Sequence, residues 1–135
     1  MLNMEKRYYT PQIDELFVGY QCEKLDYSKV PEEIWIPYIL PEYKEINTYT
    51  KIKTKYLDSE DIEKEGFKLL YKINNKNSRD FPEGEISCFI MGKYVSLYFH
   101  KNTNLVHIQN KGLYYKGGCK SINEFRKICK WLNIK

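Results

Sequence analysis

Three residues in the last third of the chain have side chains that can move protons. Glu85, His100 and His107 combine one carboxylate with two imidazoles, which are groups that serve as general acids and bases. Within hydrogen-bond reach of one another, they would form an acid–base enzyme. No catalytic or cofactor-binding motif accompanies them, so the sequence favours a non-enzymatic protein and no cofactor is expected.

A second set of residues in the same region can hold a ligand. The rings of Tyr98 and Tyr114 can stack on a base or a sugar, and Lys116 can pair with a phosphate. Two interpretations stay open: a binding face, or an outer sheet face in which tyrosine is simply a good strand former. The ligand-binding candidates are Glu85, Tyr98, His100, His107, Tyr114 and Lys116.

Hairpin turns are expected to bring these residues together. The first turn contains Gly92 and fits a two-residue type II′ turn, which places Glu85 opposite His100. The later turns predict that Tyr98 pairs with His107, His107 with Lys116, and Gln109 with Tyr114. A register error of one residue would exchange the two faces of a strand.

Alternation along these strands predicts one polar, aromatic face and one apolar face. The residues expected on the apolar face are Ile86, Cys88, Ile90, Val95, Leu97, Phe99, Val106, Ile108 and Tyr115. A helix over 121–132 is expected to cover them, with Ser121 and Glu124 as a capping box and Cys129 on its buried side.

A short helix is predicted in the first half of the chain, over 57–67. Asp58 is expected to cap it, and Gly66 to end it. The fold class is therefore α+β: an antiparallel β-meander with a C-terminal helix packed on one face and one short helix in the first half. The alternating segments 16–23 and 46–56 are expected to be further strands.

A proline-rich, apolar segment covers residues 31–41. Its three prolines are incompatible with a helix or a central strand, so a loop is expected. Such a loop either covers the protein's own core or docks on a partner or a second subunit. The contact candidates are Trp35, Tyr38 and Ile39.

Three lysines recur at every second position, at Lys51, Lys53 and Lys55. They indicate either a solvated edge strand or a strip that binds nucleic-acid phosphates. The net charge of +4 is mild for a nucleic-acid binder, and lysine greatly outnumbers arginine.

Length and composition predict a single domain, 1–135, without a secretory signal or a membrane span. The four scattered cysteines and two histidines do not predict a metal site. We expect a cytoplasmic location with reduced thiols. Abundant Lys, Asn, Ile and Tyr without alanine indicates an AT-rich coding genome.

Three segments, Arg7 to Glu23, Lys55 to Phe67 and Lys120 to Ile134, resemble small uncharacterised accessory proteins of tailed bacteriophages. The resemblance implies a phage or mobile-element protein, without an activity or functional residues that can be transferred. The favoured hypothesis is a non-enzymatic protein that binds a host protein or small ligand, with counter-defence as one role that this would serve. Nucleic-acid or nucleotide binding through a Lys/Tyr sheet face is the alternative.

Overall fold

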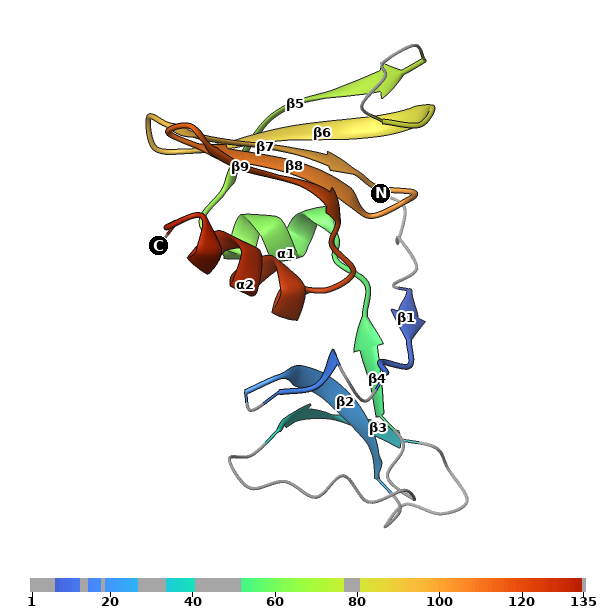
Figure 1. Cartoon of the computed structure of the whole chain (residues 1–135). Coiled ribbons are helices and arrows are strands. Elements are labelled where there is room, and N and C mark those ends of the chain that lie inside the picture. Colours follow the sequence, from blue (N-terminus) through green and yellow to red (C-terminus); the bar gives the residue numbers. More distant parts are fainter. Residues whose placement is uncertain are drawn as a thin grey trace. The chain divides into compact units, whose positions relative to one another are not determined.

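The computed structural model of the chain shows an α+β fold with two antiparallel sheets and two helices, which confirms the predicted class (Figure 1). The chain divides into two compact units, Met1–Tyr56 and Leu57–Lys135. The structure describes residues 7–12, 15–17, 19–26, 34–40, 52–76 and 81–134. We describe each unit by itself.

The first unit contains a four-stranded antiparallel sheet in the order β1-β4-β2-β3. Its strands are β1 (Tyr8–Tyr9), β2 (Gln21–Asp26), β3 (Ile34–Ile39) and β4 (Ile52–Lys55). The first alternating segment was expected to be a strand from residue 16, but strand β2 begins only at Gln21. Of the segment 46–56, residues up to 51 lie outside the described residues, and β4 covers 52–55.

The expectation of a loop in the proline-rich segment is wrong for residues 34–39. These residues form β3, which pairs with β2 along its whole length. β3 is the last strand in the sheet order, so the missing N–H of Pro37 can face the unpaired side. The sequence pattern excluded a central strand correctly but did not separate an edge strand from a loop.

A small core supports this sheet. Tyr20, Cys22, Leu40 and Ile52 are buried together. The hydroxyl groups of Tyr20 and Thr54 are hydrogen-bonded at 3.0 Å, so the buried phenol has a polar partner.

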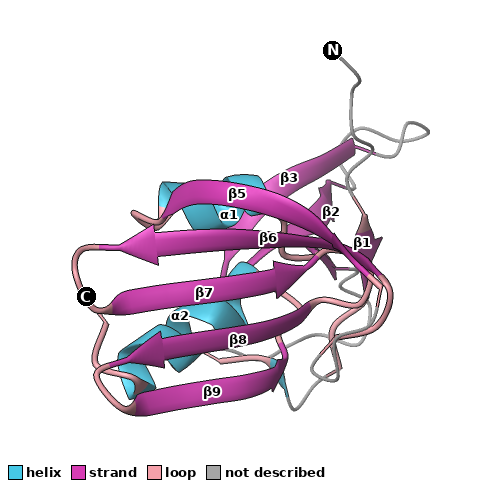
Figure 2. Cartoon of the chain, turned by 90° about the horizontal axis from the view of Figure 1, so that it is seen from above, coloured by secondary structure: helices cyan, strands magenta, loops and turns pink. Residues whose placement is uncertain are grey.

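The second unit is an antiparallel meander with two helices on one side (Figure 1). The strands are β5 (Lys68–Asn75), β6 (Gly84–Met91), β7 (Val95–His100), β8 (Leu105–Asn110) and β9 (Leu113–Gly118), and they lie in that order across the sheet. The helices are α1 (Ser59–Lys64) and α2 (Ile122–Trp131). Figure 2 looks onto the opposite face, which we call the outer face, with both helices behind the sheet.

The register of β6 differs from the expected one by a single residue. The turn between β6 and β7 has three residues, so Met91 pairs with Val95 and Ile86 pairs with His100. Because side chains alternate, this shift exchanges the two faces of β6. Phe89 and Met91 therefore face the helices, whereas Ile86, Cys88 and Ile90 belong to the outer face.

The core of this unit lies between the sheet and the helices. Phe89, Leu97, Phe99, Val106 and Ile108 come from the central strands and are completely buried. They pack with residues of the helical layer and its connections: Leu57, Ile62, Phe67, Cys119, Phe125, Cys129 and Leu132. The predicted seat of the C-terminal helix is confirmed, with the β6 contribution corrected.

The two helix starts differ in how well the sequence predicted them. At α1 the Asp58 carboxylate accepts a hydrogen bond from the N–H of Asp61 at 2.9 Å, and the Asp61 carboxylate accepts one from the N–H of Asp58. These two bonds confirm the predicted cap. At α2 the Ser121 side chain makes no capping bond. Glu124 instead accepts the N–H of Lys120 at 2.8 Å, so the expected Ser121–Glu124 capping box is wrong.

Candidate functional site

The outer face of the second unit holds three rows of side chains, each crossing all five strands. Within each row, every residue is paired with its neighbours on the adjacent strands, from β5 across to β9. The rows are Lys68, Ile90, Ser96, Gln109 and Tyr114; then Tyr71, Cys88, Tyr98, His107 and Lys116; then Ile73, Ile86, His100, Leu105 and Gly118.

Four rings on this face form what we call the aromatic row: Tyr71, Tyr98, His107 and Tyr114. The first three belong to the second of these rows, and Tyr114 lies in the first row, next to His107. The ring centroids of Tyr98 and His107 are 6.4 Å apart, and those of His107 and Tyr114 are 5.9 Å apart. Tyr71 is 46% exposed and Tyr114 is 59% exposed, so both ends of the row are accessible. Large rings that are half accessible to solvent can stack on a ligand without unfolding the sheet.

Tyr71 is tied to the middle of the outer face by its hydroxyl group. Hydrogen bonding with the Cys88 thiol, and also with Tyr98, raises the pKa of Tyr71 to about 12. Cys88 itself is buried between its neighbours on β5 and β7. The phenol therefore stays neutral over the physiological range.

One end of the outer face is closed. The imidazole of His100 is fully buried and stacks on Phe81, with ring centroids 6.1 Å apart. Its Nδ1 lies 2.7 Å from the Thr103 hydroxyl, and its Nε2 lies 3.2 Å from the Glu83 carbonyl oxygen. Through these contacts His100 stabilises the β7–β8 turn and the start of β6.

The three proposed acid–base residues do not converge. His100 and His107 lie on the outer face, but Glu85 pairs with Asn74 and alternates with Ile86, so it points to the other side of the sheet. The one-residue register shift is the cause. The pairing of His107 with Tyr98 and with Lys116 agrees with the prediction.

In the first unit, aromatic rings hold Lys53. Its Nζ lies 4.3 Å from the ring centroid of Tyr8 and 4.4 Å from that of Trp35. This double cation–π contact occupies an ammonium group that was a candidate for phosphate binding. Lys55 pairs with Tyr8 in the sheet, and Lys51 lies outside the described residues.

The other two partner-contact candidates lie on the edge strand β3. Lys24 places its Nζ 4.4 Å from the ring centroid of Tyr38, so this ring is also engaged within the unit. Ile39 is 60% exposed at the end of the strand. Of the three candidates, Ile39 presents the most accessible apolar surface.

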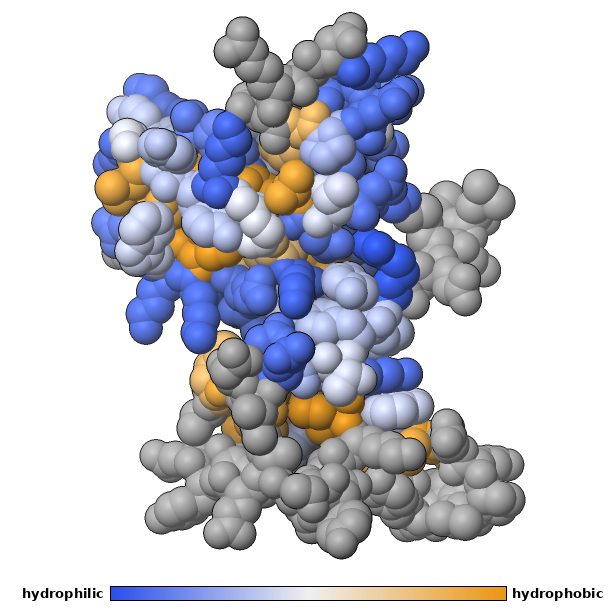
Figure 3. All heavy atoms as spheres, turned by 45° about the vertical axis from the view of Figure 1, so that its right-hand side comes forward, coloured by the Kyte–Doolittle hydropathy of each residue, from blue (hydrophilic) through white to orange (hydrophobic). Residues whose placement is uncertain are grey.

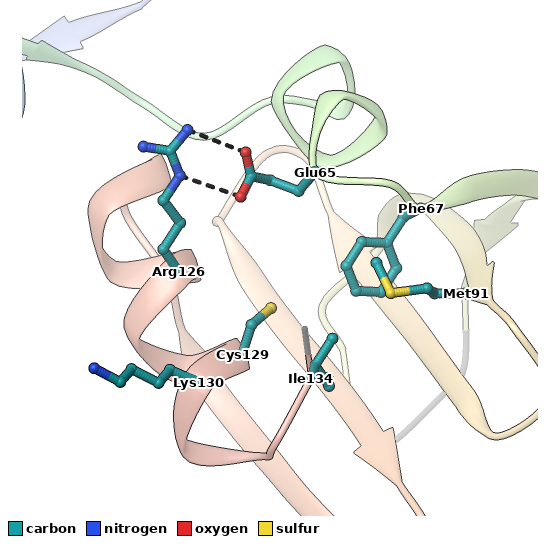
Figure 4. Close-up of a pocket in the computed structure, with 7 residues that line it drawn as sticks. All are labelled: Glu65, Phe67, Met91, Arg126, Cys129, Lys130 and Ile134. Carbon is teal, nitrogen blue, oxygen red and sulfur yellow. Dashed lines mark hydrogen bonds and ion pairs between the residues drawn. The ribbon is translucent and has the colours of Figure 1, made fainter.

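A small pocket lies between the end of α1 and helix α2 (Figure 4). Phe67, Met91, Cys129 and Ile134 contribute to its lining. Its rim carries a two-bonded ion pair in which Arg126 Nε donates to Glu65 Oε1 at 3.1 Å and Nη2 donates to Oε2 at 3.0 Å. At about 110 Å³, the pocket is well below the usual size of a ligand site.

The cysteine next to this pocket is not an activated nucleophile. Desolvation by burial, followed by the charge of Glu65, raises the pKa of Cys129 to about 12. A thiol in that range remains protonated near neutral pH, whereas a reactive cysteine needs a lowered pKa.

Sequence reasoning missed the β5 and β6 part of the outer face. No sequence signal assigns Tyr71 to a face, and the predicted two-residue turn at Gly92 puts Cys88 and Ile90 on the opposite face. The signal that could have identified them is the pair Phe89 and Met91, whose large apolar side chains fit a buried face better than an exposed one.

The hydrophobic surface of the described residues shows as patches separated by hydrophilic side chains (Figure 3). Within the described part of the chain, no three or more His, Cys, Asp or Glu side chains are grouped to hold a metal ion. No helix among the described residues is long and apolar enough to cross a membrane. No protein-family model matches the chain, and neither the curated proteins nor the solved structures compared with it give a significant match.

Proposed function

We propose that the chain is a non-enzymatic binding protein and that the outer face of the five-stranded sheet is its contact surface. The ligand presents flat apolar groups, which a host protein, a smaller ligand or a nucleic-acid base can supply. The observation that supports this proposal is the aromatic row, Tyr71, Tyr98, His107 and Tyr114, on the face opposite the packed core.

The chemistry of the outer face fits binding better than scaffolding alone. A sheet face that only had to be soluble would be served by short polar or charged residues. This face instead carries rings at 46% and 59% exposure, together with the exposed Ile73. Aromatic side chains with few rotatable bonds lose little entropy when a ligand covers them, which is why they are enriched at interaction sites.

The biological setting that we propose is a phage or mobile element acting against host defence in the cytoplasm of a bacterial cell. The AT-rich composition and the absence of alanine support that origin. An accessory protein of this kind acts by occupying a host component, so a contact face without catalytic groups is sufficient for its role.

The edge strand β3 offers a second contact surface, which we propose for a protein partner or a second subunit. Ile39 is exposed there, and among the described residues no strand pairs with the other side of β3. Replacing Ile39 by Lys should prevent such a contact without affecting the second unit. Analytical ultracentrifugation of the wild-type protein and the Ile39→Lys variant would measure the change in oligomeric state. If both proteins sediment as monomers, self-association through β3 is excluded.

The principal test compares capture by the wild-type protein and two variants. Immobilised protein is incubated with bacterial lysate, and bound proteins, nucleic acids and small molecules are quantified. Tyr114→Ala should lose the specifically captured component by at least about fivefold, because it removes an exposed stacking ring. Trp131→Ala is the matched control, since Trp131 is 69% exposed on α2 and lies outside the outer face.

Both variants must retain the wild-type circular dichroism spectrum and unfolding midpoint. Equal capture by the wild-type protein and Tyr114→Ala, or an equal loss in both variants, would contradict the assignment of the outer face.

A further inference from the structure

We infer that the outer face binds single-stranded nucleic acid, an inference that rests on the proposed contact function of that face. Bases stack on aromatic rings without strong sequence preference, and cationic side chains beside the rings hold the backbone. The outer face offers both kinds of group on one surface.

The rings are arranged as a continuous platform. Tyr98, His107 and Tyr114 follow one another across β7, β8 and β9 with centroid separations of 6.4 and 5.9 Å. Tyr71 extends the row to β5, because it pairs with Cys88, which in turn pairs with Tyr98. A chain of unpaired bases can lie across such a platform, whereas the bases of a duplex are stacked on one another and are not accessible.

The charges of the outer face suit a polyanion. The only charged residues among the fifteen of the three rows are Lys68 and Lys116, at opposite ends of two neighbouring rows. None of these fifteen residues, all of which the structure describes, is acidic. Two further lysines, Lys93 and Lys111, lie at the adjoining hairpin turns, where the ring of Tyr94 engages both of them, with its centroid 5.7 and 5.1 Å from their Nζ atoms.

Acidic residues of this unit gather on the other side of the sheet. Asp58, Glu60, Asp61, Glu63 and Glu65 belong to α1 or its caps, in the helical layer. The second unit has fourteen basic and nine acidic residues, whereas the first has eight basic and nine acidic residues. The mild net charge of the whole chain thus conceals a positive second unit, in which five of the nine acidic residues belong to α1 or its caps in the helical layer.

The arrangement favours a nucleic acid over a protein partner. A protein ligand would gain from hydrogen bonds or ion pairs with both signs of charge, and the outer face provides cations alone. The tyrosine hydroxyl groups can also reach base edges or sugar oxygens, so each ring supplies a stacking face and a polar group.

Fluorescence anisotropy with labelled oligonucleotides tests this inference. The probes are an oligothymidylate and an oligouridylate of about twelve nucleotides, within the range of site sizes for such surfaces, and a duplex of the same length. The full chain should bind at least one single-stranded probe at least about tenfold more tightly than the duplex, because only a single strand exposes base faces. The DNA and RNA probes show which sugar is preferred.

Two substitutions separate stacking from charge. Tyr114→Ala should weaken binding of the preferred probe by about 5- to 150-fold, the range that loss of one base-stacking ring gives. Lys116→Gln should lower the slope of log affinity against log salt by about 0.7, between about 50 and 200 mM salt. Lys130→Gln on α2 removes the same charge from the helical side and should leave both quantities unchanged.

The outcomes distinguish the inference from the contact function beneath it. No binding to single strands, equal affinity for the duplex, or equal effects of Lys116→Gln and Lys130→Gln would overturn the inference. If a host protein is still captured after nuclease treatment, and Tyr114→Ala abolishes that capture, the partner is a protein and the contact function stands. Absence of both oligonucleotide binding and Tyr114-dependent capture would overturn both.

Discussion

The two faces of the five-stranded sheet are formed by the same strands but carry different aromatic residues. The helix side has Phe89 and Phe99, both completely buried, whereas the outer face has Tyr71, Tyr98 and Tyr114 with partial exposure. Phenylalanine suits a closed core because it has no polar atom to satisfy. Tyrosine suits a surface that alternates between water and a ligand, so the difference separates a structural face from a contact face.

The largest expected effect on stability lies on the helix side. Phe99→Ala should lower the free energy of unfolding by about 3–5 kcal/mol, because it removes a fully buried ring and leaves a cavity. Urea denaturation followed by circular dichroism measures this change. A loss of less than about 1 kcal/mol would mean that this face is not the packed core.

A single hydroxyl group should have opposite consequences on the two faces. Phe89→Tyr is expected to destabilise the second unit by about 1–3 kcal/mol, because its new hydroxyl group is buried without a partner. Tyr98→Phe should cost at most about 1.5 kcal/mol, the usual value of one hydrogen bond. A Phe89→Tyr variant as stable as the wild-type protein in the same urea titration would break the distinction and reopen the register of β6.

High pH should test the burial of the Cys129 thiol on the helix side. Burial raises the pKa of Cys129 from 9.0 to about 12, so the unfolded chain loses this proton at lower pH than the folded one. The contribution of this thiol to the free energy of unfolding is therefore fully present below about pH 9 and is lost as the pH rises towards 12. The Cys129→Ala variant should show a shallower fall in urea midpoint between pH 9 and pH 11, and an unchanged slope would contradict the burial of this thiol.

The smallest expected effect on stability lies on the outer face. Tyr114→Ala should change the free energy of unfolding by no more than about 0.5 kcal/mol, as is usual for exposed positions. A thermal unfolding curve that overlays the wild-type curve is the expected result. A loss of more than about 2 kcal/mol would show that Tyr114 supports the fold and would weaken its role as a contact residue.

The sequence predicted those parts of the fold in which local signals agree with one another. The Asp58 cap, the turn at Gly66 and the pairing of β7, β8 and β9 all follow from residues a few positions apart. The predicted set of ligand-binding residues retains Tyr98, His107, Tyr114 and Lys116 on one face.

The errors arose where local signals have two equally plausible outcomes. A turn containing Gly92 closes a hairpin with two or three residues, and the choice decides which side chains of β6 meet the core. Packing of Phe89 under the helices settles that choice, which no local pattern records. The burial of His100 under Phe81 likewise depends on a contact between residues nearly twenty positions apart.

The prolines of β3 illustrate the same limit. Pro37 excludes a central strand, but an edge strand and a loop remain compatible with it. Pairing with β2, which lies outside the segment, decides between them. The aromatic contacts of Lys53 also join three strands, so its loss as a phosphate-binding candidate could not be read from the period-two spacing.

The central claim is that the outer face contacts single-stranded nucleic acid while the helix side is structural. The most direct measurement is a two-dimensional ¹H–¹⁵N NMR titration of the labelled full chain with oligothymidylate. We predict that the backbone signals that shift come from the rows of Tyr71, Tyr98, His107, Tyr114 and Lys116, while those of α1 and α2 stay in place. Shifts confined to the helices, or no shifts at low salt, would contradict the account.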